Sequence, residues 1–134
     1  MRKTVNMRHV IFSEHAPKPV GPYSQAIRAG GLLFVAGQVP LDPRTGKTVE
    51  GGIREQTKRV LENVKAILMA AGCTLEDVVK VNVYLKRRED FQVMNEVYSQ
   101  YFTRDPPART TIVCEMVRDE FLIEVDAIAV IRSD

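Results

Sequence analysis

The sequence lacks any long apolar stretch, because no run approaches 18 apolar residues without a charge. The basic segment Met1–Met7 is not followed by the apolar core that export signals carry. These absences argue against a membrane span and against secretion. Cysteine is also scarce, since Cys73 and Cys114 lie 41 residues apart and form no CxxC pair. We therefore expect a cytoplasmic protein with reduced thiols.

The motifs of nucleotide, metal and serine chemistry are missing as well. The chain has no Walker loop, no GxGxxG after a strand, no GxSxG elbow and no HExxH pair. His9 and His15 have no Cys or Asp at metal-ligand spacing. The sequence also lacks the excess of basic residues that nucleic-acid binding requires, since its 19 Lys and Arg residues are nearly balanced by 17 Asp and Glu residues. We expect no metal, no cofactor, no nucleic acid and no membrane partner.

What the sequence does contain is the pattern of one α+β domain. Apolar residues recur at helical spacing over residues 53–71, and a second helix is expected over residues 91–101 with Asp90 as its N-cap. The run Val78–Leu85 alternates and is rich in β-branched residues, which predicts a strand. Further strands are expected over residues 9–12, 24–29, 32–36, 108–117 and 121–131.

These elements follow the order β-β-β-α-β-α-β-β, which predicts a mixed sheet with both helices on one face. The uncovered face is then a candidate subunit interface, and a 134-residue chain leaves enough apolar surface exposed to favour self-association. Gly30-Gly31 predicts a tight turn between the second and third strands. Only three residues separate the last two strands, which would ordinarily pair them as a hairpin.

Two charged residues interrupt these last strands. Arg109 follows the rigid segment Pro106-Pro107-Ala108, and a guanidinium on an apolar strand needs an anion. That anion could be a ligand carboxylate or, alternatively, a protein carboxylate such as Asp126. Glu124 interrupts the run from Phe121 to Val125, so it should be paired with Arg109 or a lysine, or have a raised pKa that suits proton transfer.

Three stretches together resemble the RidA/YjgF family of enamine/imine deaminases. They are Gly21-Pro22-Tyr23-Ser24-Gln25-Ala26, Ala36-Gly37-Gln38-Val39-Pro40, and Pro107-Ala108-Arg109-Thr110-Thr111 with Ile123-Glu124-Val125-Asp126-Ala127-Ile128-Ala129 after it. Order and spacing are kept from about His9 to the C-terminus. The chain is thus identified as a single RidA-like domain over residues 1–134, in which about residues 1–7 form an N-terminal extension.

The resemblance implies a chorismate-mutase-like α+β fold that forms a homotrimer with three sites in clefts between subunits. It implies hydrolysis of 2-aminoacrylate and related enamine/imine acids, such as 2-iminopropanoate and 2-iminobutanoate, to 2-keto acids and ammonia without a cofactor. The expected ligand is therefore a small 2-imino or 2-keto acid. A non-catalytic trimer that binds or senses 2-keto acids remains the alternative, and a ribonuclease or translation inhibitor is a weaker one.

By position, the resemblance assigns roles to individual residues. Arg109 would bind the substrate carboxylate, and Glu124 would hold the attacking water or manage its protons. The backbone carbonyl of Gly37 would contact the substrate nitrogen or that water. Tyr23 and Asn95 would line the pocket, with Tyr23 coming from the adjacent subunit.

The resemblance also changes the expected topology and marks two departures. In this fold the last strand inserts between earlier ones, which places Arg109 and Glu124 two strand spacings apart, roughly 10 Å. A small acid and a water could fill such a gap. Thr111 is a substrate-binding candidate that stands where some members have cysteine, and Ala36 stands where many have serine. These two departures bear on substrate preference.

Overall fold

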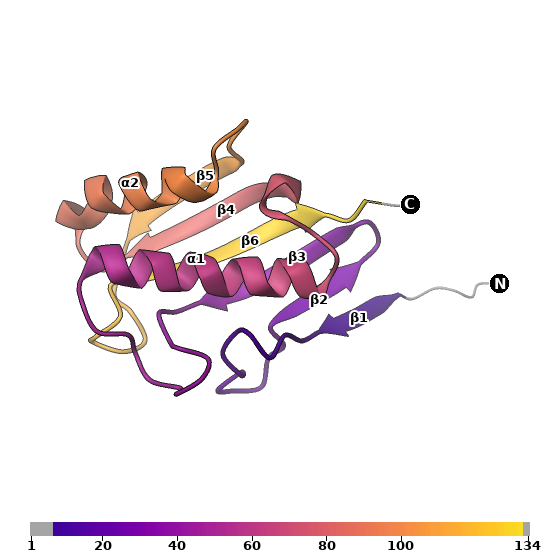
Figure 1. The fold of residues 1–134 in the computed structure, drawn as a ribbon, viewed down its shortest axis with the longest axis horizontal. Helices are drawn as coiled ribbons and strands as arrows, with labels where there is room; N and C mark the ends of the chain where they lie inside the picture. The colour runs from indigo at the N-terminus through magenta and orange to yellow at the C-terminus, as the bar shows by residue number, and fades with distance from the viewer. Residues whose placement is uncertain (1–6, 133–134) are drawn as a thin grey trace.

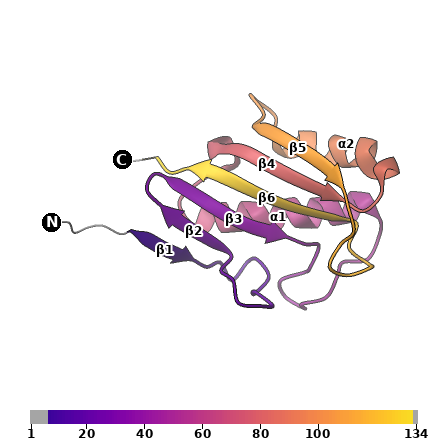
Figure 2. The ribbon, with the colours of Figure 1, turned by 180° about the vertical axis from the view of Figure 1, so that it is seen from behind.

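The alternating run Val78–Leu85 forms the central strand β4 of a six-stranded sheet, which two helices cover on one face (Figures 1 and 2). The structure is a computed structural model and describes residues 7–132. The predicted extension over residues 1–7 lies outside the described residues except for Met7. The other strands are β1 (Arg8–Ile11), β2 (Ala26–Ala29), β3 (Leu32–Gln38), β5 (Ala108–Val113) and β6 (Ile123–Val130), and the helices are α1 (Ile53–Ala70) and α2 (Phe91–Tyr101).

The strands lie in the order β1-β2-β3-β6-β4-β5. The last strand, β6, is inserted between β3 and β4 and is antiparallel to both, whereas β5 is an edge strand parallel to β4. The predicted fold class and element order are therefore confirmed, as is the insertion of the last strand. The hairpin that the short connection between β5 and β6 would ordinarily favour does not form.

Local sequence explains where the elements begin and end. Strands β2 and β3 pair through the predicted turn, in which Gly30 has a φ of 59° that L side chains rarely adopt. Helix α1 begins after Gly52, whose N–H donates to the Glu55 side chain at 2.9 Å. Strand β5 ends at Val113, four residues earlier than predicted, because its partner β4 ends opposite it at Leu85. The Cys114 N–H still donates to the Leu85 carbonyl oxygen at 2.9 Å, and the chain leaves the sheet after it.

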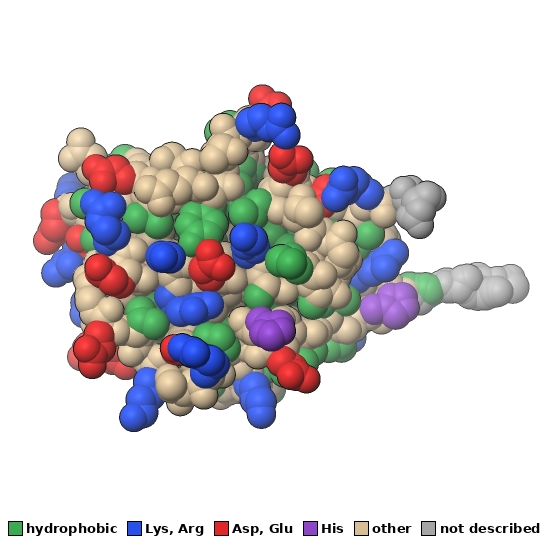
Figure 3. Space-filling view, in the orientation of Figure 1, with side chains coloured by type: hydrophobic (Ala, Val, Ile, Leu, Met, Phe, Trp, Pro, Cys, Tyr) green, Lys and Arg blue, Asp and Glu red, His purple; other side chains and the backbone are tan. Residues whose placement is uncertain are grey.

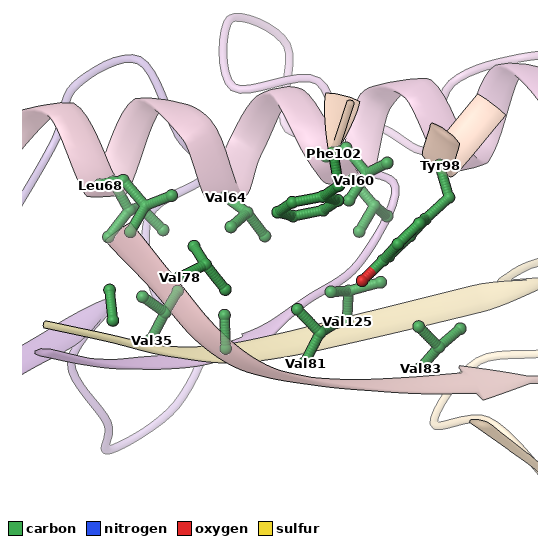
Figure 4. Packing of buried hydrophobic residues seen from close by; sticks show 14 of the residues in the cluster. Val35, Val60, Val64, Leu68, Val78, Val81, Val83, Tyr98, Phe102 and Val125 are labelled. Atoms are coloured by element: carbon green, nitrogen blue, oxygen red, sulfur yellow. The ribbon is translucent and has the colours of Figure 1, made fainter. Parts of the chain in front are cut away.

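The hydrophobic core lies between the helices and the sheet (Figure 4). Val60, Val64 and Leu68 of α1 pack over strand residues that alternate along β4 and β6. Val81, Val83 and Leu85 point to the helices, as do Ile123, Val125, Ala127 and Ala129. The intervening residues of both strands therefore point to the other face of the sheet, which we call the open face.

Neither α1 nor α2 covers the open face, since both lie on the far side of the sheet (Figure 2). Phe34 is 42% exposed there, and its cross-strand neighbours on the same face are Ile27 and Ile128. Exposed apolar rows of this kind mark association surfaces. By contrast, the helix side carries interspersed basic and acidic side chains rather than a field of one sign (Figure 3). Within residues 7–132, no helix combines the length and the apolar character that a bilayer crossing needs.

Candidate active site

The predicted site residues fall into two separate clusters. Tyr23, Gly37 and Glu124 line one cleft of about 330 Å³, which we call the acidic half-site. Asn95 and Arg109 line another cleft of about 310 Å³, which we call the basic half-site. Each cluster brings together residues from different parts of the sequence, but neither of these two clefts contains both Arg109 and Glu124.

The acidic half-site depends on the missing side chain of Gly37. The pairing of β3 with β6 shifts register between Val35 and Gln38, and Gly37 lies in this irregular segment beside Glu124. A Cβ built on Gly37 would lie 2.9 Å from the Glu124 Cδ atom and closer still to Oε2. Glycine is therefore required at position 37 if the Glu124 carboxyl group is to occupy its present place.

Glu124 has the properties that proton transfer requires. Its side chain is half-buried, and within residues 7–132 its carboxyl group forms no ion pair and accepts no hydrogen bond. Burial, and after it the negative charge of Asp126, raises the pKa of Glu124 above its ordinary value. The sequence allowed either pairing or a raised pKa, and the structure has the raised pKa. A raised pKa makes a carboxyl group a better proton acceptor than an ordinary glutamate.

The basic half-site holds Arg109 on aromatic faces. Its Cζ lies 4.7 Å from the centre of the Tyr98 ring and 5.8 Å from that of Phe91, and Nη1 is 3.9 Å from the Met94 Sδ. All three partners belong to α2, whose Tyr98 ring reaches toward Val81 and Val125 of the sheet (Figure 4). Within residues 7–132 no carboxylate pairs with Arg109.

A half-buried guanidinium that rests on rings keeps most of its in-plane N–H donors available, since in Arg109 only Nη1 donates, to the weak acceptor Met94 Sδ. Ring faces attract a cation but do not satisfy those donors, so Arg109 remains able to bind an anion in a bidentate way. The alternative of a salt bridge to Asp126 is wrong, because Asp126 accepts hydrogen bonds from Asn82 and Tyr84 on the open face. A pair between Arg109 and Glu124 is excluded by their positions on the sheet.

Those positions also correct the expected gap between the two residues. They do lie two strands apart, since β4 separates β5 from β6. However, Arg109 is opposite Val81, which is buried under the helices, whereas Glu124 is opposite Tyr84 on the open face. The two side chains thus leave opposite faces, and their positions on β4 differ by three residues, roughly 10 Å. The prediction that a small acid and a water fill a gap between them in one chain is wrong.

The remaining candidates divide between the two clusters. Ala36 lines the acidic half-site beside Gly37. Thr111 lies two residues beyond Arg109 on β5 and so shares its face, but it does not line the cleft of Arg109. The contact of the Arg109 guanidinium with the rings of Phe91 and Tyr98 was not predicted. Their spacing of seven residues is also that of any core-facing helix stripe, so the sequence carried no distinguishing signal.

The described residues give little support for histidine or metal chemistry at the half-sites. His9 and His15 are both exposed, and neither lines a half-site. Within residues 7–132 no group of three or more His, Cys, Asp or Glu side chains is arranged to hold a metal ion.

Comparison with known proteins gives consistent matches over nearly the whole chain. Residues 13–131 match the family described as endoribonuclease L-PSP. A RutC family protein of Pyrococcus horikoshii is 58% identical, over 92% of this chain and 98% of that protein. The human 2-iminobutanoate/2-iminopropanoate deaminase is 40% identical, over 92% of this chain and 90% of that protein.

Solved structures share the fold as well. A Thermotoga maritima protein has a TM-score of 0.89 and 48% identity, with 93% of this chain and 98% of that chain covered. Escherichia coli TdcF, solved with bound serine, has a TM-score of 0.87 and 36% identity, with 93% and 99% covered.

Proposed function

The chain belongs to the endoribonuclease L-PSP family, to which the RidA/YjgF proteins belong, and from this premise we propose that it is an enamine/imine deaminase. Its substrates would be 2-aminoacrylate-type intermediates, that is 2-iminopropanoate and 2-iminobutanoate, and its products 2-keto acids and ammonia. The observation that carries the proposal is Arg109, a half-buried guanidinium without a carboxylate partner among residues 7–132. The deaminase homologues in human and mouse support the same activity.

Arg109 would supply binding and orientation. The substrates carry a carboxylate next to the C=N carbon, and a planar fork of donors fixes both its position and its tilt. The rings of Tyr98 and Phe91 hold the guanidinium in place before the ligand arrives, which reduces the entropy lost on binding. Asn95 lines the same cleft and is available to contact the ligand there.

Glu124 would manage the protons of hydrolysis. A water adds to the imine carbon, and its proton passes to Glu124 as the new C–O bond forms. Glu124 passes this proton to the imine nitrogen, which gives a neutral carbinolamine. Glu124 then takes the hydroxyl proton of the carbinolamine and delivers it to the nitrogen, so that the C=O bond of the keto acid forms as the C–N bond breaks and ammonia leaves. The raised pKa of Glu124 fits a group that takes up and returns a proton in one cycle. The carbonyl of Gly37, a residue that lines the same cleft as Glu124, would orient the water or the nitrogen.

The two half-sites need two copies of the chain. Because Arg109 and Glu124 leave opposite faces, a small acid could touch both only where the basic half-site of one copy meets the acidic half-site of another. We propose a homotrimer in which Tyr23, Gly37 and Glu124 come from one subunit, and Asn95 and Arg109 from its neighbour. The apolar open face supplies the surface that such an assembly would bury.

The activity is tested by generating 2-aminoacrylate enzymatically and measuring 2-keto acid formation. The wild type should exceed the buffer rate, Glu124→Gln should lose rate while keeping 2-keto acid binding, and Arg109→Ala should lose both. Two surface variants serve as controls, Glu89→Gln for the acid and Arg104→Ala for the base, because both side chains are exposed and neither lines a half-site. A wild type that gives no rate above buffer would refute the deaminase.

The same experiment separates the alternatives. A wild type that binds 2-keto acids without turnover would support a binding or sensing trimer instead. The family description also names an endoribonuclease, so RNA cleavage belongs in the assay. We favour the deaminase because acid/base cleavage of RNA commonly relies on histidines, and both histidines here lie outside the half-sites.

A further inference from the structure

A hydrogen-bonded trio of polar side chains lies on the open face next to the acidic half-site. The Asp126 Oδ1 accepts from Asn82 Nδ2 at 2.9 Å, and its Oδ2 accepts from the Tyr84 hydroxyl at 2.7 Å. Both carboxylate oxygens are therefore held from the neighbouring strand β4. Asp126 is half-buried, and the deamination steps described above give it no role.

The trio is tied to Glu124 by strand geometry. Asp126 is two residues from Glu124 on β6 and shares its face, so the two Cα atoms are roughly 7 Å apart. Tyr84 is the cross-strand partner of Glu124, and Asn82 is that of Asp126. The Tyr84 side chain thus crosses from beside Glu124 to Asp126, which keeps the Asp126 carboxylate from turning away from its neighbour.

Asp126 is the only carboxylate among the charged and titratable groups that face Glu124 within residues 7–132. From β4 comes Tyr84, and from the loops that line the cleft come Tyr23 and Arg118. Arg118 is occupied elsewhere, since its Nη1 lies 3.6 Å from Glu120 and its Cζ 5.2 Å from the centre of the Phe121 ring.

We propose that Asp126 is a positioning residue for the reaction, held by Asn82 and Tyr84 so that its fixed negative charge lies beside Glu124 and favours the protonated form of that acid. This inference rests on the role of Glu124 in the proposed function. A second carboxylate at this distance disfavours ionisation of the first by Coulomb repulsion. Glu124 then retains the proton that the departing nitrogen needs.

The protonation of the surrounding groups agrees with this geometry. The charge of Asp126 is, after burial, the second cause of the raised pKa of Glu124. The pKa of Tyr84 is raised to about 12, first by the hydrogen bond from its hydroxyl to Asp126 and second by burial, so the hydroxyl remains a donor at neutral pH.

The test is a titration of the Glu124 carboxyl carbon by NMR in labelled full-length protein, which does not depend on activity. In Asp126→Asn the Glu124 midpoint should move to lower pH, because the repelling charge is gone. In Tyr84→Phe the Asp126 carboxylate keeps its charge but loses one anchor, so the shift should have the same sign and be smaller. This second variant keeps the test valid if the first does not fold. Glu89→Gln, an exposed acid, should leave the midpoint unchanged.

A Glu124 midpoint that stays at the wild-type pH in both folded variants overturns the inference. The pH dependence of 2-keto acid formation provides a second readout, in which the acid limb should move in the same direction as the NMR midpoint. If the midpoint shifts in protein that has no deaminase activity, the coupling of Asp126 to Glu124 stands and the proposed function fails. The two claims are therefore tested apart.

Discussion

Replacing Gly37 by alanine tests whether the position of the Glu124 carboxyl group matters for turnover. The new Cβ would lie 2.9 Å from the Glu124 Cδ and 3.2 Å from its Cγ, where ordinary contacts begin at 3.4 Å. The side chain of Glu124 must therefore swing away, and its terminal oxygens move furthest. The backbone carbonyl of residue 37 is retained in the variant, so the change acts on Glu124 alone.

The expected loss follows from the size of that movement. Misplacing a catalytic group by about 1 Å can reduce the rate by about a hundredfold, or about 2.7 kcal/mol in the barrier. Stability should change little, because Gly37 does not have a left-handed φ and the displaced atoms belong to a flexible side chain. We expect Gly37→Ala to stay within about 1 kcal/mol of the wild type in unfolding free energy.

The assay is 2-keto acid formation from enzymatically generated 2-aminoacrylate, together with urea unfolding of the same samples. Gly31→Ala is the matched control, because Gly31 directly precedes the same strand, lacks a left-handed φ and has open space around the new Cβ. It should retain the wild-type rate. A folded Gly37→Ala variant with the wild-type rate would refute the role given to the Glu124 carboxyl group.

Two further predictions concern stability. Among residues 7–132 the buried Tyr98 hydroxyl has no hydrogen-bond partner, so Tyr98→Phe should match or exceed the wild type in urea unfolding. The variant should also keep the ring under Arg109 and the affinity for a 2-keto acid, and a large loss of affinity would contradict the purely aromatic role. Because the pKa of Glu124 is raised, the folded state binds the Glu124 proton more tightly than the unfolded state does. The stability that this protonated carboxyl group contributes is therefore present at low pH. It is lost as the pH rises from 4.5, the ordinary pKa of the group, through the raised pKa. Glu124→Gln should therefore gain stability relative to the wild type across that window, and a constant difference in unfolding free energy would contradict the raised pKa.

The sequence predicted the elements because their patterns are local. The helical spacing over residues 53–71 and the alternation of Val78–Leu85 identify α1 and β4 without tertiary information. The insertion of β6 between β3 and β4 was expected only from the family resemblance. A short connection favours a hairpin, and nothing local in residues 114–122 records that the chain passes to the far side of β4.

The site was predicted in its members but not in its arrangement. Whether Arg109 and Glu124 share a face depends on two registers against β4, and a slip of one residue in either would reverse the answer. Those two registers cannot be read from the sequence alone. For the same reason Asp126 was considered as a partner of Arg109, whereas the structure places it with Asn82 and Tyr84.

The central claim is that one working site takes Arg109 from one copy and Glu124 from another. The most direct test mixes two inactive variants, Arg109→Ala and Glu124→Gln, by joint refolding in equal amounts. In any closed ring that assembles at random, about a quarter of the seams would then combine an intact Arg109 with an intact Glu124. We predict recovery of about a quarter of wild-type 2-keto acid formation in the mixture and none in either variant alone. A mixture that forms mixed assemblies yet stays as inactive as its components would contradict the account.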